Sequence, residues 1–152
     1  MKRTALLVLL AFSLIPLFAQ QQTGPAKIQT LVITGQNGHD WRGTTPLLRK
    51  ALEGTGRFEV RVTEEFRGAG VETLAPYSLV VMNYYDLRKP EMRWGEKADN
   101  ALIDFVLSGK GLVIYHFSVA AFDGWTEYEK MCAGNWRPGN GHHSAAHDFT
   151  VD

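Results

Sequence analysis

The sequence predicts an α/β fold in which helices cover both faces of a mainly parallel sheet. Two observations lead to this prediction. Short apolar runs, typical of buried strands, alternate with longer segments whose apolar residues recur at helical spacing. The helical segments lie between strand segments, which is the order that connects neighbouring parallel strands. The length of 152 residues suits a single domain of this kind.

The first strand is predicted over residues 27–34, "KIQTLVIT", which end in a compact apolar run. A helix is expected next, with Thr44 as its N-cap, Pro46 in its first turn and Gly54 at its end. Residues 58–62, "FEVRV", then alternate apolar and charged side chains, which is typical of an edge strand or a half-exposed strand.

The second half of the chain repeats this alternation. A buried strand is predicted over residues 77–83 and a helix over residues 96–107, where apolar side chains follow helical spacing. A third buried strand is expected over residues 111–115, and a short helix capped by an aspartate over residues 123–131. Residues 147–152, "HDFTVD", have the pattern of the start of a further strand.

The N-terminus has the pattern of a bacterial secretory signal peptide over residues 1–19, in which a basic pair precedes an apolar run. Cleavage near Ala19 would export the protein to the periplasm or the extracellular space. The alternative is an uncleaved anchor, and only then would the chain contact a membrane. Residues 20–26 are expected to form a flexible lead-in and residues 27–152 the domain. We expect the C-terminal part of this domain to be missing, because the chain stops inside a predicted strand.

Composition excludes several classes of function. Removal of the signal segment leaves 14 basic and 16 acidic residues, a formal charge of −2 without any basic cluster, so a nucleic-acid partner is not expected. No glycine-rich nucleotide fingerprint follows a strand, so no nucleotide cofactor is expected either. Cys132 is the only cysteine, and a single free thiol is more typical of a small buried hydrophobe than of a nucleophile.

Polar and aromatic residues follow each of the three apolar strands. Residues 35–45, "GQNGHDWRGTT", follow the first, residues 83–86, "NYYD", follow the second, and His116 follows the third. The carboxyl ends of parallel strands meet at one edge of a sheet, where ligands bind in such folds. We therefore expect His39 and His116 to face one pocket.

His39, Asp40 and His116 are the candidate catalytic residues. A histidine with a carboxylate partner suits proton transfer or metal ligation, and Asp40 is adjacent to His39 and is expected to orient its ring. Each histidine also has a structural alternative. His39 would then bond to the backbone near the helix start, and His116 would be a satisfied histidine of the core.

His39, His116 and His142 are candidate ligands of a divalent metal ion, with zinc the preferred choice. The three histidines come from separate loops and do not form a compact metal motif. Acid/base chemistry without a metal, by His116 together with Asp40 or Asp86, is therefore the open alternative.

Trp41, Trp125, Asn83 and Asp86 are the candidate residues for binding a carbohydrate. Indole rings offer apolar faces on which a sugar ring can stack, while amide and carboxylate groups bind its hydroxyls. Each tryptophan considered alone is equally well explained by packing. Together they favour a small-molecule carbohydrate as the partner.

Four stretches of the chain resemble the ThuA-like family, the trehalose-utilisation proteins. They are "LVITGQNGHDWRGTTPLLRKALEGTGRFEV", "YSLVVMNYYD", "ALIDFVLSGKGLVIYHFSVAAFDGWTEYEKMCAGNW" and the later "GHH". The resemblance runs from about residue 27 to the end of the chain. Its most specific parts are the His-Asp-Trp after the first strand and the histidine that ends the "GLVIYH" strand.

This resemblance implies a flavodoxin-like fold similar to the class I glutamine amidotransferase domain. In the amidotransferases, the strand that corresponds to residues 111–115 leads into a cysteine nucleophile. Here His116, Phe117 and Ser118 follow that strand, so glutaminase activity is not expected. The family is linked to disaccharide and keto-sugar metabolism in bacteria, and the resemblance covers only the front part of a family domain.

The sequence therefore indicates an exported ThuA-like protein that acts on or binds a sugar, a disaccharide or a keto-glycoside at the C-terminal edge of the sheet. Whether it is an enzyme is left open. The alternative is a non-catalytic carbohydrate-binding domain on a degenerate amidotransferase scaffold. A third interpretation is a truncated product without a function of its own.

Overall fold

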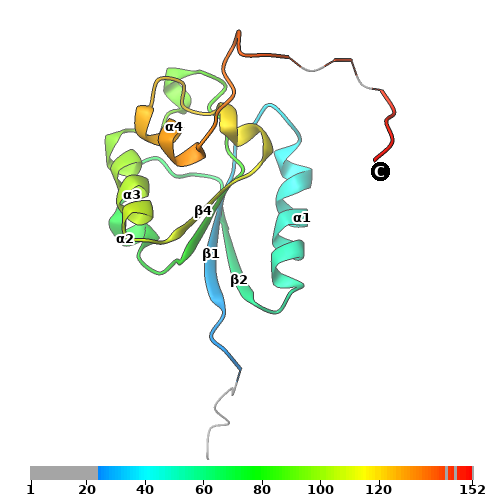
Figure 1. The fold of residues 1–152 in the computed structure, drawn as a ribbon. Coiled ribbons are helices and arrows are strands. Elements are labelled where there is room, and N and C mark those ends of the chain that lie inside the picture. Colours follow the sequence, from blue (N-terminus) through cyan, green and yellow to red (C-terminus); the bar gives the residue numbers. More distant parts are fainter. Residues whose placement is uncertain (1–23, 143, 146, 152) are drawn as a thin grey trace, which may run out of the picture.

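The computed structural model describes residues 24–142, 144–145 and 147–151 (Figure 1). The predicted signal segment, residues 1–19, lies outside the described residues, as does the lead-in up to residue 23. Within the described ranges, no helix has both the length and the apolar character needed to cross a membrane.

Four parallel strands form the sheet, in the order β2-β1-β3-β4. They are β1 (Ile28–Ile33), β2 (Phe58–Thr63), β3 (Leu79–Met82) and β4 (Gly111–Ile114). The chain runs outward from β1 to β2 and then returns past β1 to β3, so the strand order reverses between β1 and β3. Ligands of open parallel sheets bind beyond the carboxyl ends of the strands at such a reversal.

Helices connect the strands, as predicted. They are α1 (Trp41–Glu53), α2 (Val71–Leu74), α3 (Glu96–Leu107) and α4 (Thr126–Cys132), with short 3-10 helices η1 (Pro90–Met92) and η2 (His116–Ala120). The bounds of α3 are those predicted. The short α2, η1 and η2 were not expected, because segments of three to five residues are too short to show a helical period.

The predicted start of the first helix is wrong, because α1 begins at Trp41 and Asp40 is its N-cap. The Asp40 carboxylate accepts a hydrogen bond from the Gly43 N–H at 2.9 Å, which satisfies one of the free donors of the first turn. Thr44 instead lies inside the helix, where its hydroxyl donates to the Asp40 carbonyl oxygen at 3.0 Å. Both residue types make good caps, so the sequence alone did not distinguish them.

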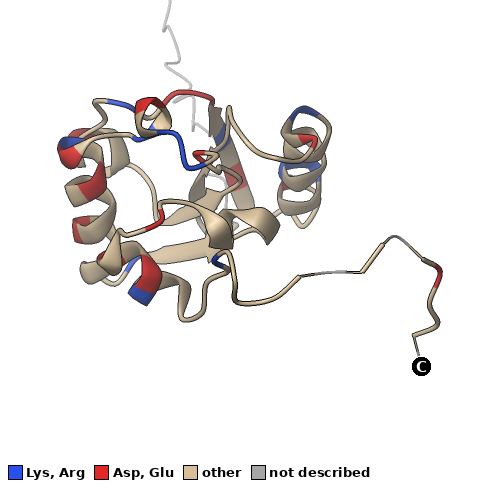
Figure 2. Cartoon of the chain, turned by 90° about the horizontal axis from the view of Figure 1, so that it is seen from above, with Lys and Arg blue, Asp and Glu red and all other residues tan. Residues whose placement is uncertain are grey.

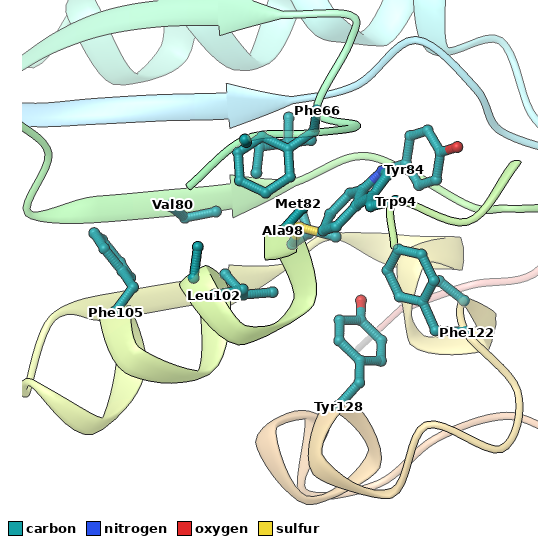
Figure 3. Packing of buried hydrophobic residues seen from close by; sticks show 14 of the residues in the cluster. Phe66, Val80, Met82, Tyr84, Trp94, Ala98, Leu102, Phe105, Phe122 and Tyr128 are labelled. Carbon is teal, nitrogen blue, oxygen red and sulfur yellow. The ribbon is translucent and has the colours of Figure 1, made fainter. Parts of the chain in front are cut away.

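Helices cover both faces of the sheet (Figure 1). On one face Val32, Val60 and Val81 form a cluster against which Leu52 of α1 packs. The other face belongs to the main core, in which residues of β1 and β3 pack with α2 and α3 (Figure 3). Neighbouring residues of one strand serve opposite faces, as the strand period of two requires.

The main core continues beyond the strand ends as a cluster of large aromatic side chains (Figure 3). Ser118 ties η2 to this core: its hydroxyl donates to the Met82 carbonyl oxygen at 3.0 Å and accepts from the Tyr84 N–H at 3.0 Å. The Tyr128 hydroxyl donates to the Ser118 carbonyl oxygen at 2.9 Å. These buried contacts hold the segment that follows β4 in one position above the sheet.

Three further expectations differ from the structure. β4 is at the edge of the sheet among the described residues and is only partly covered, with Val113 46% exposed, so it is not a buried strand. Residues 147–151 form no strand, and the side chains of Phe149 and Val151 are exposed. Finally, α4 has Trp125 as its N-cap in place of Asp123.

Candidate functional site

The structure brings the rings of His39 and His116 together above the C-terminal edge of the sheet. Their ring centroids are 4.7 Å apart, and the ring planes meet at 67° in an edge-to-face arrangement. His39 lies in the loop between β1 and α1, and His116 is the first residue of η2, separated from the end of β4 by Tyr115 alone. Both side chains are exposed, so neither is a satisfied core histidine.

The loop that carries His39 is held by short contacts at its start. Gly35 has φ +105°, and a Cβ added there would lie 2.1 Å from the Glu64 carbonyl oxygen, so only glycine fits. The Asn37 side-chain oxygen accepts from the His39 N–H at 3.1 Å. The Asn37 amide nitrogen donates to the side-chain oxygen of Asn83 at 3.3 Å.

Asn83 is 2% exposed and directly follows β3. Its side-chain nitrogen donates to the hydroxyl of Thr45 at 3.1 Å and to that of Thr44 at 3.3 Å. Together with the bond from Asn37, these contacts link the end of β3 to α1 and to the His39 loop. In this structure the predicted substrate-binding amide is thus buried and hydrogen-bonded to residues of the protein itself.

The two candidate aspartates also have structural partners. The Asp40 carboxylate caps α1 through Gly43, so the bond it makes is to the backbone and not to the His39 ring. Asp86 is 1% exposed, accepts from the Phe122 N–H at 3.1 Å and lies 3.5 Å from the Arg93 Nε. Asp86 thus joins the loop after β3 to the segment that precedes α4.

The two candidate tryptophans contribute mainly to packing. Trp41 is 7% exposed, and the guanidinium of Arg42 lies 4.0 Å from the centroid of its ring. Trp125 is half-buried and stacks on Tyr128, with ring centroids 5.4 Å apart, and contacts Phe122 edge to face. Neither side chain lines the pocket next to His116.

That pocket has a volume of about 830 Å³. It is lined by His116, Phe117, Val119, Trp136, Asn140, Gly141 and His142. The volume lies in the range of small-molecule sites. His142 therefore shares the pocket with His116, while His39 contacts His116 from beside it and packs edge to face on Phe117 at 4.9 Å.

Phe117 and Trp136 are the aromatic walls of the pocket and were not selected from the sequence. Phe117 directly follows His116 in the sequence, and this position could have marked it as a residue of the pocket. Its ring packs on Tyr85 at 4.8 Å, and a Cβ added to Gly38 would lie 3.2 Å from it, so the His39 loop also approaches this ring. Trp136 follows α4 and reaches the pocket only through the tertiary fold.

The fit of a metal ion can be tested against these positions. Among the residues that the structure describes, no group of three or more histidine, cysteine, aspartate or glutamate side chains has an arrangement that could hold a metal ion. His39 and His116 supply two ligands, whereas zinc sites in proteins use three or four. The described side chains therefore do not complete a zinc site, and we derive no step through a metal.

Cys132 lies on α4, where burial raises the pKa of its thiol above the ordinary value. A raised pKa disfavours the thiolate, which is the nucleophilic form of cysteine.

The parallel sheet, its strand order and the helices on both faces define a flavodoxin-like α/β domain, as predicted. A solved structure from Parabacteroides merdae, of a protein assigned as ThuA-like, matches this domain with a TM-score of 0.62 at 35% sequence identity. This likeness confirms the resemblance to the ThuA-like family found in the sequence. The match covers 73% of this chain and 40% of the Parabacteroides protein, so the chain spans well under half of that relative. No protein-family model matches the chain, and no curated protein matches it.

Proposed function

We propose that this protein binds a sugar, a disaccharide or a keto-glycoside at the C-terminal edge of its sheet, and that His39 and His116 transfer protons on the bound sugar. The observation that carries the proposal is the meeting of the two imidazoles, 4.7 Å apart, beside a pocket of about 830 Å³. Histidine is the side chain best suited to donate and accept protons near neutral pH.

The walls of the pocket support a sugar as the ligand. Phe117 and Trp136 are half-buried and offer aromatic faces, on which the apolar face of a sugar ring can stack. Asn140 lines the same pocket and carries an amide that can bind hydroxyl groups. In this proposal Asn83, Asp86 and Trp125 act by holding the walls in place.

Two exposed imidazoles in edge contact can divide the work of acid/base catalysis. A neutral ring accepts a proton from a sugar hydroxyl while a protonated ring donates one to an oxygen that develops negative charge. Neither role needs a third protein ligand or a carboxylate partner. The geometry therefore favours metal-free chemistry over the zinc-dependent alternative, in which His142 would have to complete the ligand set with His39 and His116.

The non-catalytic alternative makes a different prediction. A carbohydrate-binding domain would keep its affinity for sugar after both histidines are replaced, and would lose that affinity when Trp136 is replaced by alanine. Binding and turnover must therefore be measured separately.

The test compares His39→Asn and His116→Asn with the unchanged protein on a panel of glucosides and their keto derivatives. We expect turnover to fall by about 10²–10⁴-fold in either variant, the usual contribution of a general acid or base. Binding, measured by calorimetry and by the ligand-induced rise in melting temperature, should change little. His147→Asn is the matched control, because His147 is an exposed histidine whose ring contacts Ser144 and Ala145, which are close to it in the chain.

Several outcomes would contradict this assignment. Turnover that survives both substitutions would show that neither histidine transfers a proton in the reaction. Sugar binding without any turnover by the unchanged protein would show a non-catalytic binding domain. Stoichiometric zinc found by elemental analysis, and lost in His116→Asn, would replace proton transfer by metal chemistry. No sugar binding by the unchanged protein would refute the proposed function altogether.

We also propose that the protein is exported after cleavage of residues 1–19. The support is the sequence pattern alone. Mass spectrometry of the protein recovered from its native host should show a chain that begins near Gln20. A chain that retains Met1 at the membrane would show an anchor in place of a signal peptide.

A further inference from the structure

The structure also bears on which kind of sugar this site takes, an inference that depends on the proposed function. We infer that the sugar carries a negatively charged substituent, a carboxylate or a phosphate, and that Arg88 binds it. Arg88 lies in the loop after β3 and plays no part in the proton transfer proposed above.

Arg88 contacts Trp136, one aromatic wall of the pocket, and Tyr85, which packs on the other wall. Its Nε donates a hydrogen bond to the Tyr85 hydroxyl at 3.1 Å, and its guanidinium carbon lies 5.7 Å from the ring centroid of Trp136. Trp136 lines the pocket, and Tyr85 packs on Phe117, which lines it too. The guanidinium is therefore fixed beside the aromatic pocket, and its side chain is exposed.

The backbone at Arg88 adopts a costly conformation. Leu87 and Arg88 have φ values of +52° and +56°, and two consecutive residues other than glycine in this region are unusual. Each costs about 1–2 kcal/mol relative to an ordinary conformation. Asp86 helps to impose it, because its carboxylate accepts from the Arg88 N–H at 3.4 Å and from the Phe122 N–H at 3.1 Å. Such strain persists where the surroundings over-determine it, which is common at ligand sites.

Nearby arginines differ from Arg88 in their partners. Arg93 lies 3.5 Å from the Asp86 carboxylate, and Arg137 forms ion pairs with two carboxylates at 3.2 and 2.7 Å. Across the described part of the chain, no carboxylate forms an ion pair with the Arg88 guanidinium. Its terminal NH₂ groups are thus available to bind an anion.

A free guanidinium beside an aromatic pocket is suited to one class of ligand. Its planar fork binds carboxylate and phosphate in a bidentate manner, with hydrogen bonds about twice as strong as neutral ones. The residues that line the pocket include two histidines and an asparagine but no acidic side chain that would repel an anion. A uronic acid or a sugar phosphate satisfies both features, whereas a neutral sugar leaves the cation unused.

The experiment measures the affinities of methyl glucoside, methyl glucuronide and glucose 6-phosphate for the full protein by calorimetry, at low and high salt. We expect at least one acidic probe to bind about tenfold or more tightly than the glucoside, the usual value of a charged hydrogen bond. Salt should weaken binding of the acidic probe and leave the glucoside unchanged. The tighter of the two acidic probes identifies the anion as carboxylate or phosphate.

Arg88→Gln should remove this preference while affinity for the glucoside stays the same. The matched control is Arg61→Gln, which removes an equal charge from an exposed position on β2, at the opposite edge of the sheet. Tyr85→Phe removes the hydroxyl that fixes Arg88 and should reduce the preference in part.

The inference is overturned if the unchanged protein binds all three probes equally, a result that needs no variant to fold. It is also overturned if Arg88→Gln keeps the preference. In both cases binding of the glucoside would leave the proposed function intact. Failure of all three probes to bind would also overturn the inference, and the panel of glucosides and keto derivatives would then decide the proposed function separately.

Discussion

His116 is the residue in which backbone geometry and chemistry are most closely linked. Its φ of +48°, two residues past the end of β4, lies in the left-handed region, where L-residues other than glycine rarely occur. The turn that results ends the strand and brings the imidazole to within 4.7 Å of His39.

This conformation makes a prediction about stability. Glycine normally destabilises a folded chain relative to alanine, but at φ +48° it also relieves the steric cost that alanine retains. We expect His116→Gly to be more stable than His116→Ala by about 0.5–1 kcal/mol in urea unfolding, the balance of these two effects. An alanine variant as stable as the glycine variant would show that the strained turn is absent.

Single residues were predicted from the sequence with uneven success. The strand-end positions of His39 and His116 could be predicted, because a parallel sheet places all such ends at one edge. The hydrogen bonds of the Asn83 side chain and the bond from the Phe122 N–H to Asp86 could not, since these partners lie 36 to 46 residues away in the chain. A polar residue at a strand end has the same sequence signal whether it faces a ligand or supports a loop.

Among the structural elements, the turn between β1 and the His39 loop depends most on one small residue. Gly35 combines φ +105° with a close approach to the Glu64 carbonyl oxygen. Gly56, in the turn before β2, has φ +72° but open space around it. An alanine at Gly35 would therefore meet both backbone strain and a steric collision, whereas an alanine at Gly56 would meet the strain alone.

We predict that Gly35→Ala costs more than about 2 kcal/mol of unfolding free energy, because strain and collision add. Gly56→Ala should cost about 1 kcal/mol, the strain alone. Thermal and urea unfolding of both variants provide the comparison. Equal losses would contradict the close packing of the His39 loop on the end of β2.

Element boundaries show where the sequence pattern fails. The bounds of α3 were predicted correctly because its apolar residues follow a helical period over twelve residues. η2 could not be predicted, since its position depends on the contacts of Ser118 with Met82 and Tyr84. Residues 147–151 have a strand pattern, but a strand also needs a neighbour with which to pair.

For the molecule as a whole, charge is distributed around the site and not within it. Figure 2, drawn from above the strand ends, shows both acidic and basic residues along the outer helices α1 and α3. η2 itself contains neither acidic nor basic residues apart from His116. The fold thus presents an aromatic and imidazole surface above the sheet, with Arg88 beside it.

Buried tyrosines make the stability of the whole domain depend on pH. Burial, reinforced by the Asp86 carboxylate, raises the pKa of Tyr84 to about 12 from an ordinary 10.0, and burial also raises the pKa of Tyr128. The folded protein therefore holds these protons more tightly than the unfolded chain, and stability must fall as pH rises above about 10. Urea unfolding between pH 9 and 11.5 tests this, and Tyr84→Phe should flatten the decline. Stability that rises in this range would contradict the burial of Tyr84.

The fold class was predictable because hydrophobic periodicity reports which surfaces are covered, and the topology of alternating strands and helices allows few arrangements. The exposure of β4 could not be predicted, because a continuous apolar run looks the same in the sequence whether or not a neighbouring element covers the strand. The pocket was only partly predictable. Its histidines come from strand ends and loops, whereas Trp136 reaches it through the packing of α4.

The contact between the two imidazoles is the central claim, and a nuclear Overhauser effect between their ring protons tests it most directly. The resonances are assigned with His39→Asn and His116→Asn. With ring centroids 4.7 Å apart, the unchanged protein should give a cross-peak between the two rings, and each substitution should abolish it. Two assigned rings that show contacts to other residues but none to each other would contradict the account.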